Sequence, residues 1–201
     1  MKLFYAPGAC SLADHIALLE GGFDFELERV DLKTKVTETG ADFLLINPKG
    51  YVPALVLDSG DIVTENVAVL DWIATEAPAL GLTGPLGRTH LLQALAYIST
   101  EIHKGFKPIF TAAGEEERAK AQLYVGKRLR LLGDRKVGKY LFGNEPTVAD
   151  FYLFVMLRWA AKFDIAIPDG LDALQMRMNE RPKVQSAIEF EEMPAHRARS
   201  A

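Results

Sequence analysis

The positions of apolar and polar residues divide the chain into two halves with different periodicity. In residues 1 to about 77, short apolar runs alternate with helix-like segments. Phe23–Leu32 alternates apolar with charged side chains, a pattern typical of a half-buried strand. Pro53 stands second in a later apolar run, Val52–Leu57. Because proline donates no hydrogen bond to a sheet, it fits the start of a strand, where a cis bond would also fit.

The elements predicted in this half, in chain order, are a strand over Lys2–Tyr5, a helix that begins at Ser11, a strand over Phe23–Leu32, a short helix before Asn47, strands over Val52–Leu57 and from Ile62, and a helix from Val67 to about Thr75. This βαβαββα order, with a proline at the strand after the second helix, is the thioredoxin-like arrangement. Such an order describes a fold and does not fix a chemistry.

The second half is predicted to be entirely helical. Residues 78–87 contain two prolines and three glycines without periodic apolar residues, which predicts a linker. Beyond it, apolar residues at helical spacing from Leu91 to Ile102 mark one face of a long helix, which Gly105 and Pro108 should kink or end. Further helices are predicted over Glu115–Leu132, over Phe151–Ala161 behind a capping box at Thr147–Asp150, over Leu171–Glu180 and over Pro182–Phe190.

We therefore predict a thioredoxin-like domain over residues 1–77, a linker over 78–87 and an all-helical domain over 88–201. The basic segment His196–Arg199 is expected to fray. The architecture is α/β followed by all-α.

Composition and charge narrow the function classes. The chain has 201 residues, of which 49% are hydrophobic, and a net charge of −4, so nothing indicates a surface for nucleic acid or an anionic membrane. One cysteine excludes an intrachain disulfide and a two-cysteine redox motif, and scattered histidines complete no metal site. No apolar run approaches the roughly 18 residues of a membrane span. We expect a cytoplasmic protein without a metal.

The single cysteine, Cys10, follows the Pro7–Gly8 turn and directly precedes Ser11, which with Asp14 has the form of a capping box. If Ser11 caps the helix, unpaired N–H groups of the first turn lie beside the thiol, stabilise its thiolate and lower its pKa. Cys10 is therefore a candidate nucleophile. The alternative is a half-buried cysteine in a turn.

Three other segments of the first half carry candidate ligand-binding residues. Glu65 and Asn66 precede a helix, where N–H groups can hold an anion while the carboxylate pairs with an ammonium group. A ligand with an amino-acid moiety would suit them, and plain helix capping is the alternative. Val52, before Pro53, can pair with a peptide-like ligand in β fashion or serve only as a turn. Lys35 by itself is a surface lysine.

In the second half, His103 is the most informative residue. It precedes Phe106 and Phe110 by three and seven positions, which forms a polar and aromatic stripe beside the apolar face of the helix. A histidine near a thiol can exchange a proton with it near neutral pH, whereas a surface histidine is the alternative. Trp159 is expected in the core, and Asp150 is expected to cap a helix rather than to catalyse.

Together these residues resemble one family, the bacterial beta-class glutathione transferases, over essentially the whole chain. The matching segments are Lys2–Leu12, Ile46–Gly50 with Val52–Pro53, Thr64–Glu65, Ser99–Phe106, Thr147–Asp150 and Glu180–Pro182. The resemblance implies a thioredoxin-like domain that binds glutathione, a helical domain that helps to bind a hydrophobic electrophile, and a homodimer. Catalysis is implied at Cys10 and His103.

The resemblance also implies individual contacts with glutathione and the electrophile. It places Cys10 beside the glutathione sulfur, where it can form a mixed disulfide, and Val52 on the cysteinyl backbone with Pro53 as the cis proline. Glu65 and Asn66 are placed at the γ-glutamyl end and Lys35 at the far carboxylate. In the second half, the resemblance places Thr100, His103 and Lys104 at glutathione, with the histidine near the sulfurs, and Phe106, Phe110 and Trp159 in the electrophile pocket.

Three positions depart from the family's pattern. Ala96 stands where members commonly carry an asparagine that reaches the partner's glutathione, Asn66 stands where serine or glycine is usual in the superfamily, and Asp14 replaces a proline or similar residue. The predicted activity is conjugation of glutathione to hydrophobic electrophiles, with thiol–disulfide exchange through Cys10 as a second activity. The alternatives are a glutathione-dependent reductase or dehalogenase and a non-catalytic relative that binds ligands or proteins.

Overall fold

The computed structural model describes residues 1–111 and 114–193. They divide into two compact units, one built from Met1–Leu80 together with the segment from Glu180 onward, the other from Gly81–Asn179. The division after Leu80 falls inside the predicted linker. Within the described ranges, no helix is long and apolar enough to cross a membrane. The predicted basic end at His196–Arg199 lies outside the described residues.

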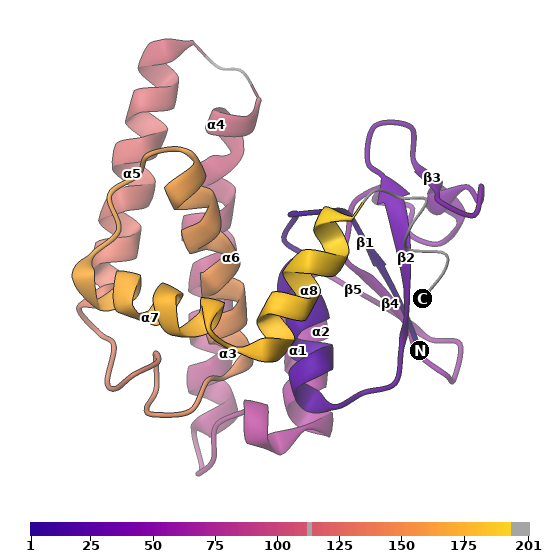
Figure 1. Cartoon of the computed structure of the whole chain (residues 1–201), viewed down its shortest axis with the longest axis horizontal. Helices are drawn as coiled ribbons and strands as arrows, with labels where there is room; N and C mark the ends of the chain where they lie inside the picture. Colours follow the sequence, from indigo (N-terminus) through magenta and orange to yellow (C-terminus); the bar gives the residue numbers. More distant parts are fainter. Residues whose placement is uncertain (112–113, 194–201) are drawn as a thin grey trace. The chain divides into compact units, whose positions relative to one another are not determined.

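A five-stranded sheet organises the first unit, with the strand order β3-β2-β1-β4-β5 (Figure 1). Its strands are β1 (Lys2–Tyr5), β2 (Glu26–Asp31), β3 (Val36–Thr37), β4 (Ala54–Val56) and β5 (Ile62–Thr64). β1 is parallel to β2 and antiparallel to β4, and β4 is antiparallel to β5. A parallel pair needs a crossover connection, which α1 (Leu12–Gly21) supplies, whereas a tight turn joins β4 to β5.

The predicted short helix before Asn47 is reduced to a single turn of 3-10 helix, η1 (Phe43–Leu45). The segment before it is polar and has too few apolar residues to bury a helical face. Instead Phe43 alone is fully buried, in a cluster with Phe4 and Val52. The other predicted strands and helices of this half are confirmed.

Helices α2 (Asn66–Glu76) and α8 (Pro182–Glu192) pack against α1 in the first unit (Figure 1). The helix α1 ends as predicted at glycine: Gly22 has a φ of 72°, and its N–H group donates to the last carbonyls of the helix. Arg181, directly before α8, holds both carboxylate oxygens of Glu20, at 2.6 and 2.9 Å. This paired hydrogen bond attaches the start of α8 to the end of α1.

The sequence predicts α8 as part of the helical domain, whereas in the structure this helix belongs to the first unit and contacts α1. Near its end, Glu191 is buried and approaches the Nδ1 atom of buried His15 within 3.1 Å. Its second oxygen accepts the N–H of Gly8 at 2.9 Å. The helix therefore contacts α1 through His15, 176 positions away in the sequence, and holds the turn that precedes the cysteine through Gly8, 183 positions away.

The second unit is helical, with α3 (Gly87–Tyr97), α4 (Lys107–Phe110), α5 (Glu115–Gly133), α6 (Val148–Lys162) and α7 (Asp169–Asn179). Helix α6 is its most buried element: every residue from Val148 to Leu157 is buried. The predicted kink is confirmed, because a π-helical stretch (Ile98–His103) and a 3-10 turn (Lys104–Phe106) separate α3 from α4.

The capping box at the start of α6 is confirmed. One oxygen of Asp150 accepts the N–H and the hydroxyl of Thr147, both at 2.8 Å, and the other accepts the N–H of Leu141 at 2.8 Å. Complete burial raises the pKa of Asp150 to about 6, against the opposing effect of these hydrogen bonds. Asp150 therefore has the predicted structural role and also anchors the loop before the helix.

Candidate functional site

The start of α1 differs from the predicted geometry. Ser11 has helical backbone angles (φ −59°, ψ −16°) and its side chain caps nothing. Its buried hydroxyl instead accepts the N–H of Ala6 at 3.2 Å, which ties the helix start to the end of β1. The carbonyl of Cys10 already accepts the N–H of Ala13 at 3.0 Å. The predicted capping box between Ser11 and Asp14 is therefore wrong, and Cys10 belongs to the first turn of hydrogen bonds.

The thiol of Cys10 is buried, and its pKa is raised rather than lowered. Its Sγ atom donates to the carbonyl oxygen of Val52 at 3.5 Å. Burial raises the pKa of the Cys10 thiol far above its ordinary value, and the carboxyl of Asp14 adds to the increase. The N–H groups of Cys10 and Ser11 act in the expected direction, but they are outweighed by desolvation. Cys10 is therefore a neutral hydrogen-bond donor.

Glu65 precedes α2 and presents its carboxylate to the surface. Its side chain is 49% exposed and makes no capping hydrogen bond, so plain capping does not describe it. The carboxylate accepts from Nζ of Lys49 at 2.6 Å and from the hydroxyl of Tyr51 at 2.7 Å. Neither Lys49 nor Tyr51 was singled out in the sequence, because these contacts join segments 14 to 16 positions apart and follow no local pattern.

The side chain of Asn66 is turned into the protein. It is buried, and its amide group donates to the carbonyl of Cys10 at 2.9 Å and to a carboxylate oxygen of Asp14 at 2.8 Å. The side-chain amide of Asn66 is therefore engaged inside the protein. The group that this position can offer to a ligand is its backbone N–H at the start of α2.

The segment Lys49–Pro53 connects the candidate residues of the first unit. The bond between Val52 and Pro53 is cis, as predicted. The carbonyl oxygen of Val52 accepts the hydrogen bond of the Cys10 thiol, and the carbonyl oxygen of Gly50 accepts a hydrogen bond from Nζ of Lys35 at 2.6 Å. Together with the contacts of Glu65, these hydrogen bonds connect Cys10, Lys35 and Glu65 to one short segment.

In the second unit, His103 is held by Tyr152. Its Nδ1 atom lies 2.7 Å from the Tyr152 hydroxyl, and its ring meets Trp159 edge-on with the ring centroids 5.1 Å apart. Burial, and secondarily the neighbouring Lys104 ammonium, lowers the pKa of His103 to about 4. The imidazole is therefore neutral near pH 7. Tyr152 was not foreseen, since it belongs to an apolar run of α6 that reads as core.

The predicted electrophile residues do not share one environment. Phe106 is fully buried, with its ring centroid 5.4 Å from that of Trp159, so it supports the aromatic surface and offers no surface to a ligand. This corrects its predicted role. Phe110 is 49% exposed and meets Trp159 edge-on at 4.9 Å. Trp159 is half-buried rather than fully in the core.

Thr100 and Lys104 are both exposed. The hydroxyl of Thr100 donates to the carbonyl of Ala96 at 2.9 Å, within its own helix, so a contact with glutathione would have to replace or share that hydrogen bond. Six of the candidates belong to the first unit and six to the second. That the two sets form one site stays a prediction.

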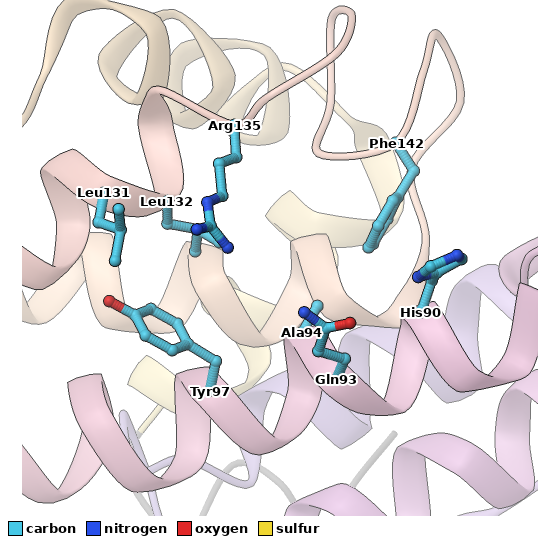
Figure 2. Close-up of a pocket in the computed structure, with 8 residues that line it drawn as sticks. All are labelled: His90, Gln93, Ala94, Tyr97, Leu131, Leu132, Arg135 and Phe142. Atoms are coloured by element: carbon cyan, nitrogen blue, oxygen red, sulfur yellow. The ribbon is translucent and has the colours of Figure 1, made fainter.

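A separate cavity of about 190 Å³ lies in the second unit, where side chains of α3 face those of α5 (Figure 2). It is lined by His90, Gln93, Ala94, Tyr97, Leu131, Leu132, Arg135 and Phe142. None of the predicted electrophile residues lines it, so the cavity does not account for their role.

Sequence comparison matches residues 9–76 to the family described as "Glutathione S-transferase, N-terminal domain" and residues 67–176 to "Glutathione S-transferase, C-terminal domain". Glutathione S-transferase GstA of Escherichia coli O157:H7 is 43% identical over 198 residues, which cover 95% of this chain and 98% of that protein.

Two solved structures are similarly close. A sphingomonad glutathione S-transferase complexed with glutathione is 44% identical with a TM-score of 0.89, and the bacterial beta-class enzyme of Sphingomonas chungbukensis is 43% identical with a TM-score of 0.88. Each match covers 96% of this chain and 100% of the other. The predicted architecture, a thioredoxin-like domain with a helical domain, is confirmed. Two family matches and relatives aligned over nearly the full length show that the chain belongs to the bacterial beta class of the glutathione S-transferases and is a transferase that acts with glutathione.

Proposed function

We propose that glutathione binds along the segment Lys49–Pro53 and that its sulfur attacks a small hydrophobic electrophile. The observation that carries this proposal is the hydrogen bond from the Cys10 thiol to Val52 at the cis proline, with the exposed carboxylate of Glu65 held nearby by Tyr51. A strand start of this kind can pair with a peptide backbone.

Each charged part of the tripeptide then has a partner in the first unit. The carboxylate of Glu65 pairs with the γ-glutamyl ammonium, and the backbone N–H of Asn66, at the start of α2, binds the adjoining carboxylate. Lys35 binds the carboxylate at the glycine end of glutathione. To do so, its ammonium group gives up the hydrogen bond to the carbonyl of Gly50. Val52 pairs with the cysteinyl backbone.

The chemical step is a nucleophilic substitution or addition by the glutathione thiolate. The neutral thiol of Cys10 turns its single S–H from the carbonyl of Val52 to that thiolate, which favours the ionised form of glutathione, and the glutathione proton leaves to solvent. The thiolate forms a bond to the electrophilic carbon as the leaving group departs with its electron pair. Because exchange through Cys10 requires the Cys10 thiolate, its raised pKa favours conjugation over exchange.

Thiol exchange is a slower activity of the same residues. In it, the Cys10 thiolate attacks oxidised glutathione, forms the mixed disulfide and releases one glutathione thiolate. A reductase or dehalogenase would also depend on attack by the Cys10 thiolate, so the raised pKa of Cys10 favours conjugation as the main activity. The neutral imidazole of His103 assists at the sulfur as a hydrogen-bonding group, and Phe110 and Trp159 offer aromatic surface to the electrophile.

The wider context of the proposal comes from the family's pattern. From that pattern we propose a cytoplasmic homodimer that detoxifies electrophiles without a metal. In the family's pattern an asparagine at position 96 reaches the glutathione of the partner subunit. Ala96 cannot make this contact, because its side chain forms no hydrogen bond.

Cys10 variants test the assignment of the thiol. We expect Cys10→Ala to lower conjugation of a chloronitrobenzene about tenfold, because one hydrogen bond to the thiolate is lost. Cys10→Ser keeps a donor and is expected to stay within a few fold of the wild type. Both variants are expected to form no mixed disulfide with oxidised glutathione, as measured by mass spectrometry before and after a reductant. Full conjugation by Cys10→Ala, or no retention of the wild type on immobilised glutathione, would contradict the proposal.

The pH dependence tests the state of His103. Since its pKa is lowered to about 4, the imidazole stays neutral from pH 5 to 9 and contributes no inflection to the profile of kcat/KM in that range. His103→Ala is expected to lower kcat/KM about tenfold at every pH without changing the shape of the profile. An inflection between pH 6 and 7 that disappears in His103→Ala would show that the histidine titrates during catalysis.

A further inference from the structure

We propose that Asp14 is a positioning residue for glutathione: through a buried pair with Asn66 it fixes the first residues of α2 relative to the Cys10 peptide. This inference rests on the proposed function, because it concerns the placement of the same binding groups. Asp14 itself touches neither glutathione nor the reacting sulfur; it acts through Asn66.

The pair joins the starts of two helices. Asp14 lies in the first turn of α1 and Asn66 is the first residue of α2. The Asn66 amide donates to Oδ2 of Asp14 at 2.8 Å and to the carbonyl of Cys10 at 2.9 Å. One side chain thus holds both the Cys10 peptide and a carboxyl group one helical turn further along α1, so the separation of the two helix starts is fixed.

The pair is poorly suited to stabilising the fold alone. Asp14 is completely buried, and its Oδ1 atom has no hydrogen-bond partner. A buried polar atom without a partner costs free energy, so an apolar side chain of similar size would be the better choice for stability. The stability of the domain therefore does not explain a carboxyl group at position 14. Its hydrogen bond with the Asn66 amide, through the other oxygen, does.

The anchored asparagine controls the residue before it. Glu65 has a φ of 75°, in the left-handed region that residues with a Cβ rarely adopt, and this backbone directs its carboxylate to Lys49 and Tyr51. Such a conformation persists only when its surroundings hold it. The side-chain hydrogen bonds of Asn66 provide that restraint from the adjacent position.

One hydrogen of the Asn66 amide goes to the Cys10 carbonyl, and the other gains a buried acceptor only because position 14 supplies one. We therefore expect the effects of the two side chains on glutathione binding to be coupled.

A double-mutant cycle in the full-length protein tests the coupling. Asp14→Leu and Asn66→Ala are each expected to weaken glutathione binding, measured by isothermal titration calorimetry, about tenfold, because each leaves the other polar group unpaired. The double variant is expected to bind as weakly as either single variant and not a hundredfold more weakly. Asp14→Asn is the conservative control: its amide oxygen still accepts from Asn66, so its affinity is expected to stay within about twofold of the wild type.

A second measurement does not depend on glutathione. The rate at which iodoacetamide alkylates Cys10 is expected to change at least threefold in Asn66→Ala, which frees the Cys10 carbonyl. It is expected to change less in Asp14→Asn, which keeps that hydrogen bond and removes only the carboxylate that adds to the raised pKa of the thiol. If the wild type binds no glutathione, the proposed function fails while this rate still tests the pair.

Unchanged glutathione affinity in the folded single variants would overturn the inference and leave the pair a structural one. Effects that multiply in the double variant would overturn it too, because the residues would then act independently. Thermal denaturation identifies the folded variants, and Asp14→Ser takes the place of Asp14→Leu if the latter does not fold.

Discussion

Replacing Asp150 with alanine is expected to lower the free energy of unfolding by about 3 kcal/mol. The carboxylate of Asp150 accepts from the N–H and hydroxyl of Thr147 and from the N–H of Leu141, all at 2.8 Å and all buried. Alanine removes the cap of α6 and leaves two buried N–H groups without an acceptor. Because α6 is the most buried helix of its unit, its start has no route to solvent that could replace those bonds.

Urea and thermal denaturation measure this effect, for which a decrease in Tm of about 6 to 12 °C is expected. Asp172→Ala is the matched control, since Asp172 is an exposed carboxylate in the first turn of α7. Its substitution is expected to change the free energy of unfolding by less than about 0.5 kcal/mol. Equal losses in the two variants would show that the buried hydrogen bonds of Asp150 are not the cause.

The same residue gives the stability a predictable dependence on pH. Burial raises the pKa of Asp150 to about 6 in the folded protein, whereas the unfolded chain has an ordinary value of 3.8. Between these values the folded state binds more protons, so the free energy of unfolding decreases as the pH rises, by about 3 kcal/mol from pH 4 to above pH 6. Urea denaturation as a function of pH is expected to show a smaller decrease in Asp150→Asn than in the wild type. A decrease of the same sign remains in both proteins, because burial also raises the pKa of Asp14.

Glu65→Gln is expected to weaken glutathione binding about thirtyfold with little change in kcat at saturating glutathione. Glutamine is similar in shape and keeps an acceptor for Tyr51, but it removes the charge that pairs with the γ-glutamyl ammonium. The loss concerns binding to a part of glutathione remote from the sulfur, which is why KM rather than kcat is expected to change.

Calorimetry and the KM for glutathione measure this effect. Glu26→Gln is the control, because Glu26 is an exposed glutamate of the same unit that pairs with Lys2 on the sheet, at 3.3 Å. It is expected to bind glutathione like the wild type. If Glu65→Gln also binds like the wild type, Glu65 does not hold the γ-glutamyl end.

Local patterns predicted most of the elements. The glycine stop after α1, the capping box at Thr147–Asp150 and the kink before Pro108 each depend on a few neighbouring residues, and the structure confirms all three. The Ser11 capping box followed the same rule and failed. Its hydroxyl found a partner in Ala6, at the end of the preceding strand, which a helix-capping pattern does not include.

The site residues show the same division. The candidates Cys10, Val52 and Glu65 could be found because each lies at a turn or helix start that has a recognisable sequence form. Their partners could not: Tyr152, which holds His103, lies 49 positions away in an apolar run, and Asn66 meets Asp14 across 52 positions. Such pairs carry no periodicity.

By itself, the sequence determined the order of four of the five strands and of the longer helices, and the family, and it supplied the candidates for the chemistry-bearing residues. It could do so because turn chemistry and hydrophobic periodicity act over a few neighbouring positions. Only the tertiary structure decided that α8 packs on α1, that Phe106 is inaccessible and that the thiol of Cys10 is a neutral donor. The physical reason is that burial is set by every element packed around a group. Desolvation can therefore reverse the direction in which a helix start alone would move a pKa.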